Sequence, residues 1–314
     1  MDPGLAAYQK EKYTRLKAKD GSGYMRFENI VSFGDAASDI GNYEYLAKNK
    51  KLINYSQPKQ KGGKKLQFYN NGRLSEGKIW IDYLGDAFGA QVRSRAYAYS
   101  TTNMGWLFNG NKRNVPGLYQ QVQRFASESM KNQLNPNSTL YTIWGGANDL
   151  FSVSISKWHK KSTPDKAVGP KQVMDDMIKS IRFLIEHPNI KAKNILFLTV
   201  LPVDKAPIID QVPNEIRNKV LQNLETLKSF YKKMEFKDTN FVLYDANEFL
   251  SKMYKNHKDY GIPYSKHPCI ASLTRKCTTP HEFFWYDNSH IGSTTHLHLA
   301  LDIIKKKFGN AIVG

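Results

Sequence analysis

Three short polar segments, far apart in the chain, carry residue types that suit acid–base or nucleophilic chemistry. They are residues 34–42 (GDAASDIGN), 146–149 (GAND) and 287–290 (DNSH). A histidine three residues after an aspartate can exchange a proton while the carboxylate holds its ring, and an asparagine amide can donate to an oxyanion. Each segment alone is ordinary turn chemistry, so the functional interpretation depends on finding all three together.

The elements around these segments predict where the segments meet. Strand patterns cover residues 27–33, 138–144, 194–201 and 241–245. Helical patterns cover residues 75–88, with Ser75 as N-cap and Gly89 as the end, and residues 115–130, 169–187, 214–234 and 296–308. Strands that alternate with helices predict an α/β sandwich around a mainly parallel sheet, and active sites of such sheets lie beyond the carboxyl ends of the strands.

Together the segments resemble the GDSL, or SGNH, hydrolase family, whose pattern is Gly-Asp-Ser-Leu-Ser-Asp, then Gly-x-Asn-Asp, then Asp-x-x-His. Residues 71–80 (NGRLSEGKIW) resemble the Gly-Arg-Phe-Ser-Asn-Gly-x-x-Trp block of a subgroup that contains secreted bacterial lysophospholipases and glycerophospholipid–cholesterol acyltransferases. The resemblance implies a three-layer α/β/α sandwich of the flavodoxin-like kind. We expect this sandwich to form a single domain over residues 25–314, with residues 1–24 as an N-terminal extension.

Ala36 stands where the family has its nucleophilic serine, and alanine has no oxygen with which to attack. Ser38 matches the second serine of the motif and lies several Å from the expected point of attack. The other family positions survive, namely Asp39, Asn148, Asp287 and His290. Their survival favours a deliberate replacement of serine at position 36, and a natural pseudoenzyme is the alternative.

The resemblance also implies a role for each site residue. A serine at position 36 would attack an ester, His290 would move its proton, and Asp287 would hold the imidazole. The oxyanion donors would be the backbone N–H of residue 36, the backbone N–H of Thr101 and the side chain of Asn148. This chemistry needs no cofactor. No metal is expected either, because the remaining histidines form no convincing ligand set; His296 and His298 point to different sides of a helix.

The composition bears on partners and location. The net charge is +18, which favours anionic partners such as acidic phospholipid surfaces, and no nucleic-acid-binding module is recognisable. We therefore expect peripheral membrane contact and no nucleic acid. No apolar stretch approaches the roughly 20 residues that span a bilayer, and the N-terminal residues lack an apolar signal core. We expect a secreted protein whose export signal has been removed.

The two cysteines, Cys269 and Cys277, suit a local disulfide in an oxidising compartment, with two free thiols as the alternative. This pair resembles one found in the secreted Legionella lysophospholipase A group. We hypothesise that the loop covers the cleft and holds a cleavage point for an activating protease around Arg275-Lys276. The expected function is hydrolysis of phospholipid or lysophospholipid acyl esters, with or without acyl transfer. The alternatives are a carbohydrate O-acetyl esterase and an inactive lipid- or glycan-binding protein.

Overall fold

The computed structural model describes residues 16–17, 24–25, 27–49, 69–104, 115–130, 133–155, 169–272 and 275–308. Most of the predicted N-terminal extension lies outside these ranges. Two short strands, β1 (Leu16–Lys17) and β2 (Tyr24–Met25), pair antiparallel before the main sheet begins. Among the described helices, none has both the length and the apolar character to cross a bilayer.

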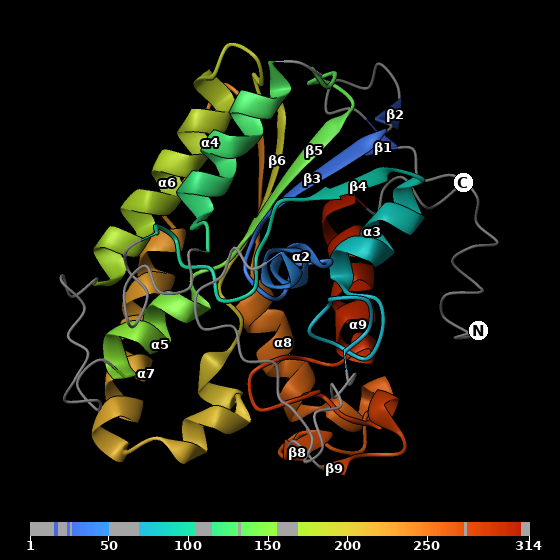
Figure 1. Cartoon of the computed structure of the whole chain (residues 1–314), viewed down its shortest axis with the longest axis vertical. Coiled ribbons are helices and arrows are strands. Elements are labelled where there is room, and N and C mark those ends of the chain that lie inside the picture. Colours follow the sequence, from blue (N-terminus) through green and yellow to red (C-terminus); the bar gives the residue numbers. More distant parts are fainter. Residues whose placement is uncertain are drawn as a thin grey trace.

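A five-stranded parallel sheet forms the centre of the molecule (Figure 1). Its strands are β3 (Asn29–Gly34), β4 (Gln91–Ser94), β5 (Thr139–Trp144), β6 (Asn194–Leu198) and β7 (Asn240–Tyr244). Their spatial order is β4-β3-β5-β6-β7. The strand order therefore reverses between β3 and β5, which is the flavodoxin-like arrangement, and ligands bind at such switch points. This confirms the predicted fold class.

Helices cover both faces of the sheet, with α4, α6 and α7 on one side and α3, α8 and α9 on the other (Figure 1). The helices are α2 (Asn42–Lys48), α3 (Trp80–Phe88), α4 (Leu118–Ser129), α5 (Ala147–Ile155), α6 (Pro170–Glu186), α7 (Asn214–Tyr231), α8 (Ala246–Lys255) and α9 (Ser293–Ile303), which continues as a π-helix over Ile304–Phe308. Short 3-10 turns lie at Val203–Lys205, Pro207–Gln211, His257–Tyr260 and Pro280–Glu282.

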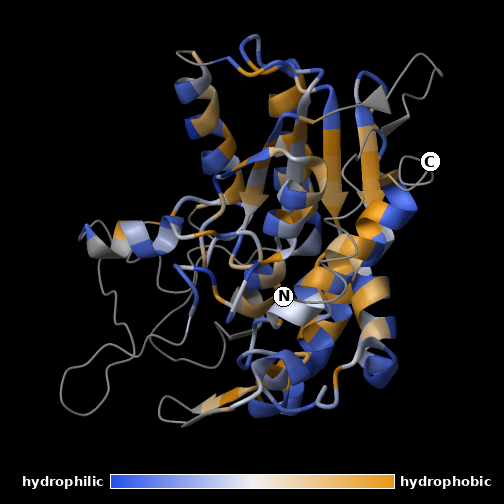
Figure 2. Cartoon of the chain, turned by 90° about the vertical axis from the view of Figure 1, so that its right-hand side faces the viewer, coloured by the Kyte–Doolittle hydropathy of each residue, from blue (hydrophilic) through white to orange (hydrophobic). Residues whose placement is uncertain are grey.

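Alternation along the strands builds the two halves of the core. On β3, Val31 and Phe33 pack with α4, α6 and α7, whereas Ile30 packs with α3, α8 and α9. Because both faces are covered, the central strands are hydrophobic along most of their length, as Figure 2 shows in orange. The sheet is thus a rigid base for the loops at its carboxyl edge.

Helix α3 begins later than the sequence pattern suggested. We predicted Ser75 as the N-cap of a helix over residues 75–88, but the helix starts at Trp80. The backbone N–H of Ile79 donates to the carboxylate of Asp82 at 2.9 Å, which caps the helix at Ile79 instead. The predicted end is correct, since Gly89 adopts the left-handed conformation with φ 61°.

Candidate active site

The turn after β3 carries Ala36 and is sharply bent. Gly34 has φ 148°, and a β-carbon there would collide with the carbonyl of Trp144 on β5, so only glycine fits. The turn closes through hydrogen bonds to Asp35, whose carboxylate accepts from the N–H of Ala37 at 3.1 Å. Ala36 itself is only 9% exposed. A short side chain at position 36 is therefore held on a rigid turn at the switch point.

The side chain of Asp39 holds this turn through hydrogen bonds. Its buried carboxylate accepts backbone N–H groups from Gly41, Asn42, Tyr43 and Ala98 at 2.7–3.1 Å. Burial raises the pKa of Asp39 to about 6, against the lowering effect of these donors. The bond from Ala98 ties the first polar segment to residues 96–101. Asp39 therefore has a structural role.

The segment after β5 holds residues 100–102 in place. The side-chain amide of Asn148 donates to the carbonyl of Ser100 at 2.8 Å, and the carboxylate of Asp149 accepts from both the N–H and the hydroxyl of Thr102. Burial raises the pKa of Asp149 to about 7. An amide nitrogen carries two hydrogens, so the bond to Ser100 uses one N–H of Asn148 and leaves a second for a ligand.

The Ser100–Thr101 peptide is trans, and its carbonyl and N–H point in opposite directions. Because the Ser100 carbonyl faces Asn148, the N–H of Thr101 leaves the peptide on the other side. Its assignment as an oxyanion donor stays a prediction.

Asp287 and His290 form a hydrogen-bonded pair. The imidazole Nδ1 lies 2.7 Å from Oδ2 of Asp287 and 2.9 Å from Oδ1. Burial alone would lower the pKa of His290, but the charge and hydrogen bond of Asp287 outweigh burial and raise it. Conversely, burial alone would raise the pKa of Asp287, but His290 and the other donors to its carboxylate lower it. The carboxylate thus stays charged and fixes the ring through Nδ1.

The pair lies beside the turn that carries Ala36. Asp35 and His290 are close enough that the charge of each shifts the pKa of the other. Burial is the larger effect on Asp35 and raises its pKa to about 6. The first and third polar segments therefore meet at the carboxyl edge of the sheet, on the side of the β3–β5 switch point. The catalytic roles of Ala36, Asn148 and the pair stay predictions.

Ser38 is unsuitable as a substitute nucleophile. It is fully buried, and its hydroxyl accepts the indole N–H of Trp80 at 3.1 Å. Its carbonyl accepts the hydroxyl of Ser94 at 2.7 Å. The role of Ser38 is to anchor the turn to α3 and β4.

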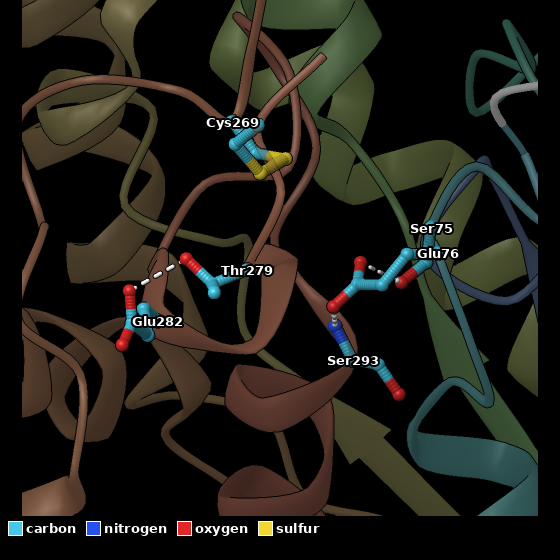
Figure 3. The surroundings of a disulfide bond; sticks show 7 residues. Ser75, Glu76, Cys269, Thr279, Glu282 and Ser293 are labelled. Carbon is cyan, nitrogen blue, oxygen red and sulfur yellow. Dashed lines mark hydrogen bonds between the residues drawn. A yellow bond between two sulfur atoms is a disulfide. The ribbon is translucent and has the colours of Figure 1, made fainter.

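Residues 69–80 form hydrogen bonds with Asp287 and with Ser293, just after the Asp287–His290 pair. The NGRLSEGKIW block therefore has a structural role at this segment. The hydroxyl of Tyr69 donates to Asp287 at 2.8 Å. The carboxylate of Glu76 accepts the N–H of Ser293 at 2.9 Å, as Figure 3 shows. The hydroxyl of Ser293 in turn donates to the Lys78 carbonyl at 2.7 Å. Neither Tyr69 nor Glu76 was predicted as a site residue. Only their place in or beside the NGRLSEGKIW block could have indicated their role.

Cys269 and Cys277 form a disulfide (Figure 3). It closes a small hairpin of β8 (Ile270–Ser272) and β9 (Arg275–Lys276). The N–H groups of Cys269 and Ile270 donate to the carbonyls of Trp285 and Tyr286, directly before Asp287. Residues 273–274 and the side chains around the hypothetical cleavage point lie outside the described structure. The aromatic residues Phe284, Trp285 and Tyr286 are fully buried and belong to the core, whereas Phe283 is half-buried.

His296 is a buried, neutral histidine near His290. It is 2% exposed, packs edge-on against Trp144 with ring centroids 6.4 Å apart, and its Nδ1 has no hydrogen-bond partner. Burial, with a smaller effect of His290, lowers the pKa of His296 to about 3. His298 points elsewhere, 3.1 Å from the Tyr260 carbonyl. No group of three possible ligands among the described His, Cys, Asp and Glu residues could hold a metal.

His296 predicts a specific loss of stability in acid. The unfolded chain binds a proton at this histidine below about pH 6.5, whereas the folded chain does not bind it until about pH 3. The free energy of unfolding should therefore fall with decreasing pH. Between about pH 7.5 and pH 5, His296→Gln should reduce this fall by about 2 kcal/mol, measured by urea unfolding.

Comparison with the parent chain is essential here, because Asp35, Asp39 and Asp149 have raised pKa values and act in the opposite direction. They stabilise the folded state at low pH, and that contribution is lost as pH rises through about 6 to 7. Their effect cancels in the difference between the two chains. An identical pH dependence in parent and variant would contradict the burial of a neutral His296.

Comparisons with known proteins agree with this geometry. Residues 30–303 match the family model described as GDSL-like Lipase/Acylhydrolase. A GDSL esterase/lipase of Arabidopsis thaliana is 23% identical over 287 residues, covering 76% of this chain and 73% of the relative. The phosphatidylcholine-sterol acyltransferase of Aeromonas hydrophila is 22% identical over 257 residues, covering 78% and 66%. An Arabidopsis protein described as an inactive GDSL esterase/lipase-like protein is 22% identical over 303 residues, covering 87% and 70%.

Proposed function

Because the chain belongs to the GDSL-like lipase/acylhydrolase family, we propose that its site is built to cleave acyl esters of phospholipids or lysophospholipids, with Ala36 at the nucleophile position. Family membership gives the reaction class, a carboxylic ester hydrolase. The observation that carries the proposal is the Asp287–His290 pair, with Nδ1 and Oδ2 2.7 Å apart, beside the turn after β3. A pair so placed can activate a serine hydroxyl at position 36.

With serine at position 36, the reaction proceeds through an acyl-enzyme. The unprotonated His290 takes the hydroxyl proton as the oxygen attacks the ester carbonyl, and then gives the proton to the departing alcohol. Asp287 stabilises the imidazolium during both transfers. Water then attacks the acyl-enzyme and releases the fatty acid. If another alcohol attacks in place of water, the same site performs acyl transfer.

A cavity near the segment that carries the pair offers space for a phospholipid head group. It holds about 600 Å³, and Asn288, next to Asp287, forms part of its wall. Lys266, Lys205, Asp204 and Asp210 also line it, and both carboxylates are paired, Asp204 with Lys205 at 2.9 Å and Asp210 with Arg217 at 3.0 Å. Lys266 is exposed and suits the phosphate of a head group. The name of the Aeromonas relative also refers to phosphatidylcholine.

The proposed substrate class is tested with the Ala36→Ser chain on lysophosphatidylcholine, a neutral monoacylglycerol of the same chain length, and an acetylated sugar. We expect the lysophospholipid to give the largest kcat/KM. A preference for the acetylated sugar would support a carbohydrate O-acetyl esterase and contradict our proposal.

Lys266 allows a sharper test of the cavity. Lys266→Glu in the Ala36→Ser chain should raise KM for lysophosphatidylcholine about 5- to 10-fold, because it places a carboxylate near the phosphate. KM for the monoacylglycerol should not change. Lys237→Glu is the matched control, since this exposed lysine precedes β7 at the opposite edge of the sheet. Equal effects of the two substitutions would mean that only net charge matters.

A natural pseudoenzyme is the second candidate. It is favoured by Ala36 itself and by the Arabidopsis relative that is described as inactive. In that case the site would bind a lipid or glycan without cleaving it, and restoring serine would confer no turnover. The intact Asp287–His290 geometry supports the hydrolase proposal instead.

We also propose that the protein is secreted and acts at anionic lipid surfaces. The disulfide between Cys269 and Cys277 fits an oxidising compartment, and the net charge of +18 favours anionic membranes. The hairpin that the disulfide closes hydrogen-bonds to the segment before Asp287. Proteolytic nicking of this hairpin near Arg275-Lys276 is therefore proposed as a means of activation.

A further inference from the structure

Tyr69 reaches the Asp287–His290 pair, the dyad, from a distant part of the chain, 218 residues before Asp287. Its hydroxyl lies 2.8 Å from Oδ2 of Asp287. Its ring packs edge-on against Tyr286, with centroids 5.7 Å apart, in a small cluster with Cys269 and Ile270. The disulfide hairpin and the residue before Asp287 therefore both help to hold the ring in place.

The two oxygens of Asp287 are held differently. Oδ1 accepts the backbone N–H groups of Ser289 and His290 at 2.8 and 2.9 Å, so the main chain fixes it. Oδ2 accepts only side-chain donors among the recorded bonds, namely the Tyr69 hydroxyl and the His290 imidazole. Without Tyr69, Oδ2 would keep only one of these two donors, the imidazole that it is meant to orient.

We propose that Tyr69 is a positioning residue, whose hydroxyl fixes Oδ2 of Asp287 so that the carboxylate meets Nδ1 of His290 in one orientation. This inference rests on the proposed function, because it assigns Tyr69 a part in the same proton transfer. Burial, with the nearby charge of Asp287, raises the pKa of Tyr69, so the hydroxyl keeps its proton and remains a donor. A tyrosine suits this task because its rigid ring holds the hydroxyl at a fixed distance from the backbone.

The charged groups around His290 determine how its pKa responds to removal of the Tyr69 hydroxyl. Burial disfavours the imidazolium, whereas Asp287 and Asp35 stabilise it; His296, also near His290, is neutral. Burial raises the pKa of Tyr286, and Glu76 and Asp287 both lie close enough to its hydroxyl to raise it further. Without the Tyr69 hydroxyl, the negative charge of Oδ2 is shared with one donor fewer. Asp287 then interacts more strongly with His290, and the pKa of His290 should rise.

The first experiment uses the chain with Ala36 and needs no turnover. The imidazole of His290 is titrated by NMR in the parent and in Tyr69→Phe. We expect a higher pKa of His290 in the variant. Tyr244→Phe is the matched control, because the Tyr244 hydroxyl donates to Asp302 at 2.5 Å, away from the dyad. A shift no larger than that of the control would overturn the proposal.

The second experiment uses the Ala36→Ser chain. Tyr69→Phe should lower kcat about 10-fold while KM changes less than about twofold, because the hydroxyl does not touch substrate. The acid limb of the pH–rate profile should move to higher pH. In a double-mutant cycle with Asp287→Asn, the effect of Tyr69→Phe should disappear, since Tyr69 acts through Asp287. Effects that multiply independently would overturn the proposal.

Two safeguards keep the test decisive. If Tyr69→Phe does not fold, Asp287→Asn in the chain with Ala36 should shift the NMR signal of the Tyr69 ring carbon that bears the hydroxyl, and an unchanged signal would overturn the proposal. If the Ala36→Ser chain shows no turnover, the proposed function fails. The NMR titration still decides whether Tyr69 positions Asp287.

Discussion

Ala36→Ser is expected to raise ester hydrolysis by at least about 10³-fold, measured as kcat on lysophosphatidylcholine. Removing the nucleophile of a serine hydrolase typically costs about 10⁶-fold, and the remaining oxyanion hole retains about 10³-fold over water. The parent chain should therefore show only the residual rate. The variant should also react once with a fluorophosphonate, which labels an activated serine through loss of fluoride.

The structure supports a large gain because the surroundings of position 36 are already formed. The turn is fixed by Gly34 and Asp35, and the backbone N–H of residue 36 is the same in alanine and serine. Adding one oxygen to a side chain that is 9% exposed requires little rearrangement. Nearly the whole barrier change then comes from supplying the nucleophile.

Ser38→Ala in the parent chain is the control for an unexpected nucleophile. Ser38 is buried and its hydroxyl is bonded to Trp80, so the residual rate should not change. If Ala36→Ser gives neither turnover nor fluorophosphonate labelling while its fold is intact, the hydrolase proposal is wrong. The pseudoenzyme reading would then be favoured.

The meeting of the polar segments was predictable from the sequence. Residues 34–42 and 146–149 each follow an apolar strand pattern, and carboxyl ends of parallel strands meet at one edge of the sheet. Both segments were therefore expected at the same edge of the sheet. The Asp287–His290 spacing was also informative, since a turn brings residues three apart into contact.

Other features left no local signal. Strand β4 (Gln91–Ser94) is a short edge strand, and its sequence QVRS lacks the apolar run that marked the inner strands. The start of α3 depends on a bond from Ile79 to Asp82, which competes with the N-cap expected at Ser75. Tyr69 has its partner 218 residues away, and only the folded chain brings them together. Contacts between distant segments thus account for the features that the sequence pattern did not predict.

Asn148→Ala in the Ala36→Ser chain is expected to lower kcat about 10²- to 10³-fold. The amide nitrogen has one N–H bonded to the Ser100 carbonyl, and the second is proposed to stabilise the oxyanion of the tetrahedral intermediate. Loss of one such donor typically costs about 3–4 kcal/mol in the transition state. Because the donor acts mainly in the transition state, KM should change little, and steady-state kinetics on lysophosphatidylcholine measures both constants.

The bond to Ser100 offers a competing explanation, since Asn148→Ala also removes a tether of residues 100–102. Thr102→Val separates the two effects, because it removes the hydroxyl bond to Asp149 at 2.6 Å and loosens the same segment without touching the amide. If Asn148 donates to the oxyanion, Thr102→Val should cost far less than Asn148→Ala. Equal losses would show that Asn148 serves only to hold the segment, and the oxyanion hole would have to be assigned to other donors.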